Sequence, residues 1–242
     1  MALDVSTACI GITILVDDGS KYGKIAEMTH ISPKIPTKSK GIETLFIKKQ
    51  QFQQFIKNFS TYPIDKVVIE EPLLSSNNKN TVATLLRFNG MISDCIYNEL
   101  GIVPIYISSY EAREYSFPEL MAVRKYGKDE NIYKPNKIIN NIKNNNYSLF
   151  GSYPWTIDKK SVLHEKVSQL FPEIKWTYDK KGELKKENFD ATDSYVACLG
   201  QMNKEKYGEL TFKSANVQVS ENKVEYDVIY WDRIEHRTTY LS

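Results

Sequence analysis

Apolar residues recur with two different periods along residues 1–206. Short runs rich in β-branched residues predict strands, because these side chains favour extended backbone. Apolar positions three and four residues apart predict amphipathic helices. The predicted strands are 1–5, 10–16, 24–32, 64–71 and 102–107. The predicted helices are 43–59, 81–100, 159–171 and 189–206. Three meandering strands followed by alternating helices and strands predict an α/β fold, with a mixed five-stranded sheet flanked by helices.

Two segments fall outside this alternation. Residues 114–157 contain several prolines and an Asn-rich tract at 140–146, which predict an insertion with one or two short helices. From residue 209 the apolar period changes to two, which predicts a C-terminal β-hairpin. We therefore expect one domain over residues 1–208 and a hairpin extension over residues 209–242.

Composition adds few constraints. The net charge of +2 neither indicates nor excludes a nucleic-acid partner, because a local basic stripe can face phosphate. No apolar run approaches the roughly 20 residues of a membrane helix, and the chain starts directly in a predicted strand rather than in a signal peptide. Cys9, Cys95 and Cys198 are far apart and form no CxxC pair, so we expect buried thiols in a reducing cytoplasm.

Carboxylates interrupt the apolar pattern at two places. Asp4 lies inside an otherwise apolar strand, where a buried charge is costly unless something compensates it. A divalent metal ion is one such partner, and a turn cap or backbone N–H donors are the alternative. Asp190 and Asp193 are three residues apart and therefore share one helix face. Acids also favour helix N-termini for structural reasons, so this pair alone leaves both interpretations open.

A further acid makes the metal interpretation stronger. Glu70 lies at the end of the first strand that follows the first helix. Carboxylates from neighbouring parallel strand ends and from a packed helix can converge, and a set of carboxylates without His or Cys favours Mg²⁺ or Mn²⁺. Two such ions about 4 Å apart clamp the attacking and leaving oxygens of a phosphodiester.

The order of these motifs resembles a known family. Asp4-x-Ser6, then Ile69-Glu70, then Asp190-Ala191-x-Asp193-Ser194 is similar to the RuvC-type Holliday junction resolvases of the ribonuclease H-like superfamily, over residues 1–201. The resemblance implies a ribonuclease H-like sheet. It also implies that two Mg²⁺ ions, with Mn²⁺ as a substitute, are held by the following four residues. These are Asp4, Glu70, Asp190 and Asp193, with Glu71 as the alternative to Glu70 because a one-residue slip reverses the strand face.

The resemblance also implies contacts with DNA. It suggests that a lysine at the start of the helix from residue 159 contacts the scissile phosphate, and we favour Lys160 as a catalytic residue. Further candidates for DNA binding are Arg87, Arg113, Lys159, Lys180 and Lys181, each with a solvated surface position as the alternative. The insertion, the hairpin and the Ser at position 6 depart from the bacterial pattern and are similar to phage or other viral members.

The implied function is a metal-dependent, structure-selective endonuclease that resolves four-way and other branched DNA. Because a junction presents two equivalent strands, we expect a two-fold symmetric homodimer, located in the cytoplasm of the host cell. Two alternatives remain open at this point. One is another ribonuclease H-like nuclease, which cuts RNA–DNA hybrids or flaps. The other is a non-catalytic protein that binds branched DNA or takes part in packaging.

Overall fold

The computed structural model describes residues 1–72, 78–118, 159–208, 212–220, 223–231 and 233–240. Within them, five strands form one sheet in the order β3-β2-β1-β4-β5. The strands are β1 (Ala2–Val5), β2 (Ile10–Val16), β3 (Lys24–Ile31), β4 (Val68–Glu70) and β5 (Ile105–Ile107). The first three are antiparallel to one another, whereas β4 runs parallel to β1 and β5 runs parallel to β4. The expected mixed five-stranded sheet flanked by helices is therefore confirmed.

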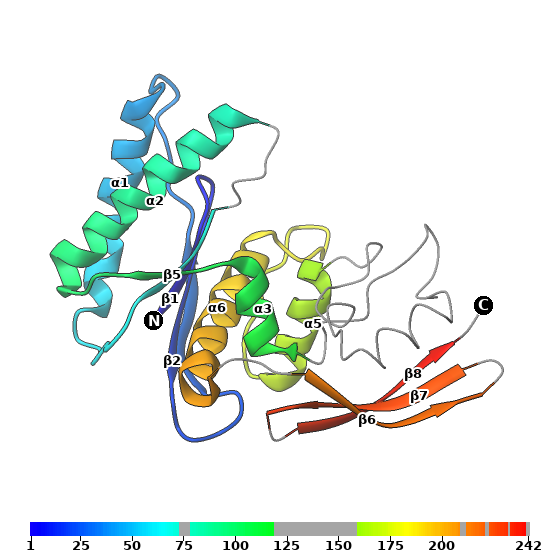
Figure 1. Ribbon diagram of the computed structural model, residues 1–242. Helices are drawn as coiled ribbons and strands as arrows, with labels where there is room; N and C mark the ends of the chain where they lie inside the picture. Colours follow the sequence, from blue (N-terminus) through cyan, green and yellow to red (C-terminus); the bar gives the residue numbers. More distant parts are fainter. Residues whose placement is uncertain (73–77, 119–158, 209–211, 221–222, 232, 241–242) are drawn as a thin grey trace.

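Helices cover both faces of this sheet (Figure 1). One face carries α1 (Ile42–Ile56), which continues into a 3₁₀ turn (Lys57–Phe59), and α2 (Lys79–Leu100). The other face carries α6 (Glu187–Tyr207), which is flanked by α3 (Ser109–Ser116) and α5 (Lys159–Leu170). The result is a three-layer arrangement in which the sheet is buried between two helical layers.

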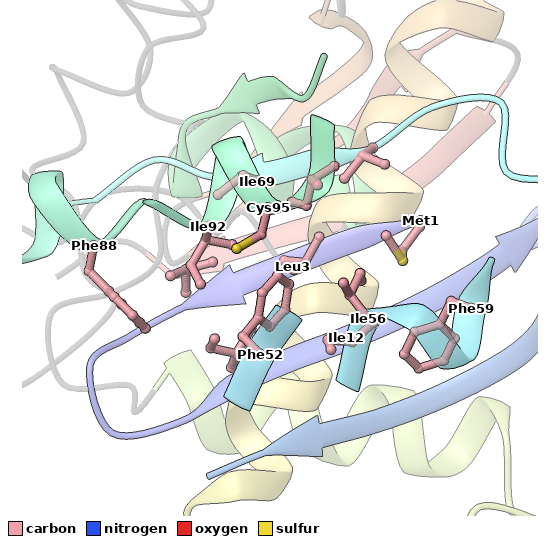
Figure 2. Packing of buried hydrophobic residues seen from close by; sticks show 14 of the residues in the cluster. Met1, Leu3, Ile12, Phe52, Ile56, Phe59, Ile69, Phe88, Ile92 and Cys95 are labelled. Atoms are coloured by element: carbon pink, nitrogen blue, oxygen red, sulfur yellow. The ribbon is translucent and has the colours of Figure 1, made fainter. Parts of the chain in front are cut away.

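The strand pleat divides the core into two clusters. Leu3 and Ile69 belong to the cluster under α1 and α2, and Figure 2 shows Phe52 of α1 and Ile92 of α2 in this cluster beside Leu3. Ala2 and Val68 instead belong to the cluster under α3, α5 and α6. Because side chains two apart on a strand share a face, residues 4 and 70 lie on the face that α6 covers.

Two strands are shorter than their apolar runs predict. The run 64–71 contributes only β4 (Val68–Glu70), and the run 102–107 contributes only β5 (Ile105–Ile107). Pro104 has no N–H to donate to a ladder, which explains the late start of β5. Helix α6 begins two residues earlier than predicted, at Glu187.

The C-terminal segment corrects the predicted hairpin. Strands β6 (Phe212–Val219), β7 (Lys223–Tyr230) and β8 (Arg233–Tyr240) form a three-stranded antiparallel sheet. The hairpin corresponds to β6 and β7, and β8 extends it. Strand β8 escapes detection because polar residues occupy both of its faces, so its sequence does not alternate. Trp231 attaches this sheet to the main domain, with its ring 4.9 Å from the Tyr207 ring of α6.

Other expectations concern the insertion, the cysteines and membrane helices. The predicted insertion at 114–157 lies mostly outside the described residues, because α3 ends at Ser116 and residues 119–158 are not described. All three cysteines are buried and free of disulfides, as expected. No helix in the described part of the chain is both long enough and apolar enough to cross a membrane.

Candidate functional site

Four carboxylates meet on the face of the sheet that α6 covers. Strand β1 contributes Asp4, its parallel neighbour β4 contributes Glu70, and the first two turns of α6 contribute Asp190 and Asp193. We call these four residues the acid cluster. Their charges act on one another: Glu70, Asp193 and Asp190 all raise the pKa of Asp4. The structure therefore brings together the four acids that the sequence singles out.

Strand β2 positions the helix acids because Gly11 has no side chain. Gly11 pairs with Asp4 across the ladder, and the backbone of α6 passes directly over it. A Cβ atom at position 11 would lie 2.0 Å from the carbonyl oxygen of Asp190 and 2.6 Å from the amide nitrogen of Ala191. Only glycine allows this approach, which places the first turn of α6 beside Asp4.

Buried hydroxyl groups hold the same contact. The Thr13 and Ser194 side-chain oxygens lie 2.8 Å apart and share a hydrogen bond between β2 and α6. The Ser194 hydroxyl also donates to the carbonyl oxygen of Ala191, at 2.7 Å. Both hydroxyl groups are fully buried, so each needs these partners. They fix the rotation and height of α6 on the sheet.

A second glycine brings a cation to the acid cluster. A Cβ atom at Gly200 of α6 would lie 2.5 Å from the carbonyl oxygen of Ala112, so α3 also packs against bare backbone. The Asn203 side chain donates to the carbonyl oxygen of Tyr115 at 2.9 Å and strengthens this contact. Arg113 follows Ala112 on α3, and its positive charge lowers the pKa of Glu70.

Helix α5 supplies the other cation. The ammonium group of Lys160 lies 2.9 Å from an Asp193 carboxylate oxygen and 3.7 Å from an Asp190 oxygen. Burial opposes its charge, but Asp193, Asp4 and Asp190 together raise the pKa of Lys160 well above its usual value. Lys160 is therefore a permanent positive charge between the acids.

The acid cluster holds more negative charge than these cations compensate. Burial is the largest cause that raises the pKa of Asp4 well above its usual value, and the neighbouring acids follow. Burial, then repulsion from Asp193, raises the pKa of Glu70 to about 7. Burial also raises the pKa of Asp190, although Lys160 opposes this. A site with this electrostatic character favours an additional cation.

The carboxylate oxygens of the acid cluster are suitable ligands for a hard divalent cation, but they are not arranged around one common point. Carboxylates without His or Cys are the ligands that Mg²⁺ and Mn²⁺ prefer. Across the described residues, however, no three His, Cys, Asp or Glu side chains are placed ready to hold a metal ion. The ammonium of Lys160 pairs with two of the acids instead.

The other predicted residues differ in how close they lie to the acid cluster. Val68 lies on the α6 face, so the pleat of β4 places Glu70 rather than Glu71 on that face. Glu71 is exposed, and its N–H donates to the carbonyl oxygen of Ile107 at 2.8 Å. Arg87 is exposed on α2, on the opposite face of the sheet. Lys159 begins α5. Lys180 and Lys181 are exposed in the turn that precedes α6.

A groove opens beside the acid cluster. Its lining includes Lys160 and Asp190, the β1–β2 turn at Ala8 and Cys9, and Lys185 and Lys186 before α6. Neither this groove nor the role of Gly11 was predicted from the sequence. A glycine inside a β-branched run is the one signal that pointed to the close approach of another backbone.

Comparison with known proteins gives matches among solved structures only. No protein-family model and no curated protein matches the sequence. The structure of T. thermophilus RuvC in complex with Holliday junction substrate is 6% identical, with a TM-score of 0.49, over 85% of this chain and 93% of that chain. A second Thermus thermophilus RuvC structure is 10% identical, with a TM-score of 0.48, over 85% of this chain and 94% of that chain. Identities this low say nothing of the site residues.

Replacing Gly11 with alanine tests how α6 is positioned. We expect Gly11→Ala to lower the free energy of unfolding by about 1–3 kcal/mol or more, because the new methyl group collides with backbone that cannot yield easily. Urea denaturation measures this change. Gly90→Ala is the matched control, because a Cβ there meets open space in helix α2, and we expect it to raise stability by up to about 1 kcal/mol. Equal stability of wild type and Gly11→Ala would contradict this account of the contact.

The raised pKa of Glu70 gives a pH-dependent stability. Its pKa rises from 4.5 to about 7 on folding, so between these values the folded state binds more protons than the unfolded state. Stability without metal should therefore fall as pH rises through this window. Glu70→Gln removes this effect. We expect the difference in the free energy of unfolding between Glu70→Gln and wild type to rise by about 1–3 kcal/mol from about pH 5 to about pH 8.

Urea denaturation in the presence of a chelator, at both pH values, measures the difference. Glu71→Gln is the matched control, since the neighbouring side chain is exposed and should show no such gain. A parallel pH dependence in wild type and Glu70→Gln would show that Glu70 titrates normally.

Proposed function

We propose that this protein is a metal-dependent endonuclease that cuts branched DNA, and four-way junctions in particular. The observation that carries the proposal is the convergence of the acid cluster from β1, β4 and α6, on one face of a ribonuclease H-like sheet. Structural packing alone does not require four carboxylates at one place, and their mutual repulsion opposes folding. Such a cluster is explained by a function that uses divalent cations.

The chain's own residues have separate roles in this proposal. Asp4 and Glu70 lie on adjacent strands and form the rigid half of the site, while Asp190 and Asp193 are held by the contact of α6 with Gly11. Mg²⁺ held by carboxylates of this kind would activate water and stabilise the charge on the leaving oxygen of a phosphodiester. The acid cluster positions these charges, and hydrolysis leaves a 5′ phosphate on the product.

Three lysines and three further acids line the groove beside the acid cluster, and the lysines are the groups that we propose for contact with a polyanionic substrate. Lys185 and Lys186 line the groove next to Asp190, and Arg113 lies close enough to Glu70 to lower the pKa of that carboxyl. We propose that they neutralise phosphates on either side of the cleaved bond. We propose that Lys180 and Lys181, which are exposed in the turn before α6, extend this contact.

A four-way junction also requires two active sites related by two-fold symmetry. We propose that α2 forms the dimer contact. Leu86 and Tyr97 are exposed on this helix, and they share a face with Ser93, whose hydroxyl lies 2.6 Å from that of Tyr106 on β5. Tyr106 is itself exposed. Exposed apolar side chains on adjoining elements are typical of a surface that pairs with another protein.

Cleavage of synthetic DNA substrates tests the proposed function. With Mg²⁺ we expect paired, symmetric nicks in a labelled four-way junction. We expect Asp4→Asn to reduce the rate by about a thousandfold, because a lost metal ligand removes several kcal/mol of charge stabilisation. Linear duplex, a flap and an RNA–DNA hybrid are run beside the junction. Asp65→Asn, a change of an exposed acid outside the site, is the matched control and should cut as wild type does.

Each other outcome has a definite meaning. Cutting of the hybrid or the flap in place of the junction would keep the nuclease assignment and reject the substrate. Tight binding of the junction without cutting of any substrate would favour a DNA-binding protein. Undiminished cutting by Asp4→Asn would reject the acid cluster as the catalytic site.

Sedimentation equilibrium tests the dimer. We expect a mass of twice the 27.9 kDa of one chain, and we expect Tyr97→Glu to shift the protein to monomer because it buries a charge in the apolar contact. Tyr178→Glu changes an equally exposed tyrosine far along the chain and should leave the mass unchanged. A monomeric wild type, or a dimer that survives Tyr97→Glu, would contradict α2 as the contact.

A further inference from the structure

The ammonium group of Lys160 stands inside the acid cluster. It is 2.9 Å from Asp193 and 3.7 Å from Asp190, and it is close enough to Asp4 and Glu70 for its charge to lower the pKa of both carboxyls. A single positive charge thus contacts both helix acids and acts on both strand acids. The ammonium group thus lies where the four carboxylates would otherwise bind a metal cation.

The two ends of this ion pair differ in their freedom to move. The Asp193 side chain is 4% exposed and belongs to a helix fixed on bare strand backbone, whereas the Lys160 side chain is 48% exposed. The ammonium therefore reaches into the acid cluster from the solvent side. It can leave by rotation of its own flexible chain, while the carboxylates stay in place.

The charges favour replacement of the ammonium by a divalent ion. The four carboxyl groups can carry up to four negative charges once a cation favours their ionised forms, whereas Lys160 and Arg113 supply only two positive charges nearby. A divalent cation brings twice the charge of an ammonium group to the same acids, and it binds carboxylate oxygen directly. Lys160 also lines the groove that contains Lys185 and Lys186, so this groove is open to the displaced side chain.

We propose that Lys160 is an internal counter-cation that holds the acid cluster in the metal-free protein and is displaced from it when a divalent metal binds. This inference rests on the metal site of the proposed function. It assigns Lys160 a second state, in which its charge moves from Asp193 into the groove beside Lys185 and Lys186. Metal binding then both loads the acid cluster and makes the groove more positive.

Calorimetric titration of the metal-free protein with Mn²⁺, without DNA, tests the exchange. Lys160→Met keeps most of the side-chain length and removes the charge, so no ammonium has to leave. We expect it to bind Mn²⁺ about ten- to a hundredfold more tightly than wild type. The charge-assisted hydrogen bond between the Lys160 ammonium and Asp193 is then absent and no longer competes with the metal ion. Lys175→Met removes an exposed lysine outside the cluster and should bind Mn²⁺ as wild type does.

The alternative results separate this inference from the proposed function. Equal or weaker Mn²⁺ binding by Lys160→Met, with wild-type binding abolished by Asp4→Asn, would overturn the exchange and keep the metal site. Absence of Mn²⁺ binding in all variants and in wild type would overturn both.

A second measurement uses the wild-type protein and does not depend on how the Met variant folds. The Lys160 ammonium should give a protected ¹H–¹⁵N signal in the metal-free protein, assigned by its loss in Lys160→Arg. We expect Mg²⁺ to abolish this protection as the ammonium enters solvent. A signal that stays protected at saturating Mg²⁺ would overturn the exchange.

Discussion

The contact between α6 and strand β2 at Gly11 is the constraint on which the rest of the site depends. With no side chain at this position, the backbone of Asp190 and Ala191 lies directly on the strand that pairs with β1. A larger residue would lift the helix and separate its two carboxylates from those of Asp4 and Glu70. The hydrogen bond between Thr13, two residues along β2, and Ser194, one turn along α6, fixes the same approach. The proximity of the four carboxylates, and so their mutual repulsion, thus depends on the absence of a side chain at Gly11.

The fold holds these carboxylates against their own repulsion. Buried acids without full compensation are destabilising, and the raised pKa values of Asp4 and Glu70 reflect this cost. Apolar packing of α3, α5 and α6 over the same face of the sheet offsets it. The two nearby cations arrive through that packing: Arg113 on α3, which approaches at Gly200, and Lys160 on α5. Stability and function therefore compete at one place, which is common where a site must receive a ligand.

Much of the sheet and of the acid cluster was predictable, because both rest on strong local signals. Long periodic runs mark the strands and helices, and an acid in an apolar strand is conspicuous at Asp4. The choice between Glu70 and Glu71 needed the pleat and register of β4, which a short run does not define. Strand β8 was missed because it does not alternate. The proximity of Arg113 to Glu70 was not predictable, because it depends on a close contact between α3 and α6, far apart in sequence. The pairing of Lys160 with Asp193 likewise requires the tertiary structure.

In the proposed function the acid cluster supplies the chemistry, and the choice of substrate must come from the surfaces around it. The turn of residues 177–186, which lines part of the groove, is held next to the acid cluster by the side chain of Asn188. Asn188 of α6 donates to the carbonyl oxygen of Thr177 at 2.7 Å and accepts from its N–H at 3.1 Å. This pairing closes the turn of residues 177–186 against the helix that carries Asp190. Under the proposed function, a DNA strand in the groove would therefore meet Lys185 and Lys186 at a fixed position relative to Asp190. The proposed function therefore assigns the selection of DNA to this turn, which can vary without disturbing the acids themselves.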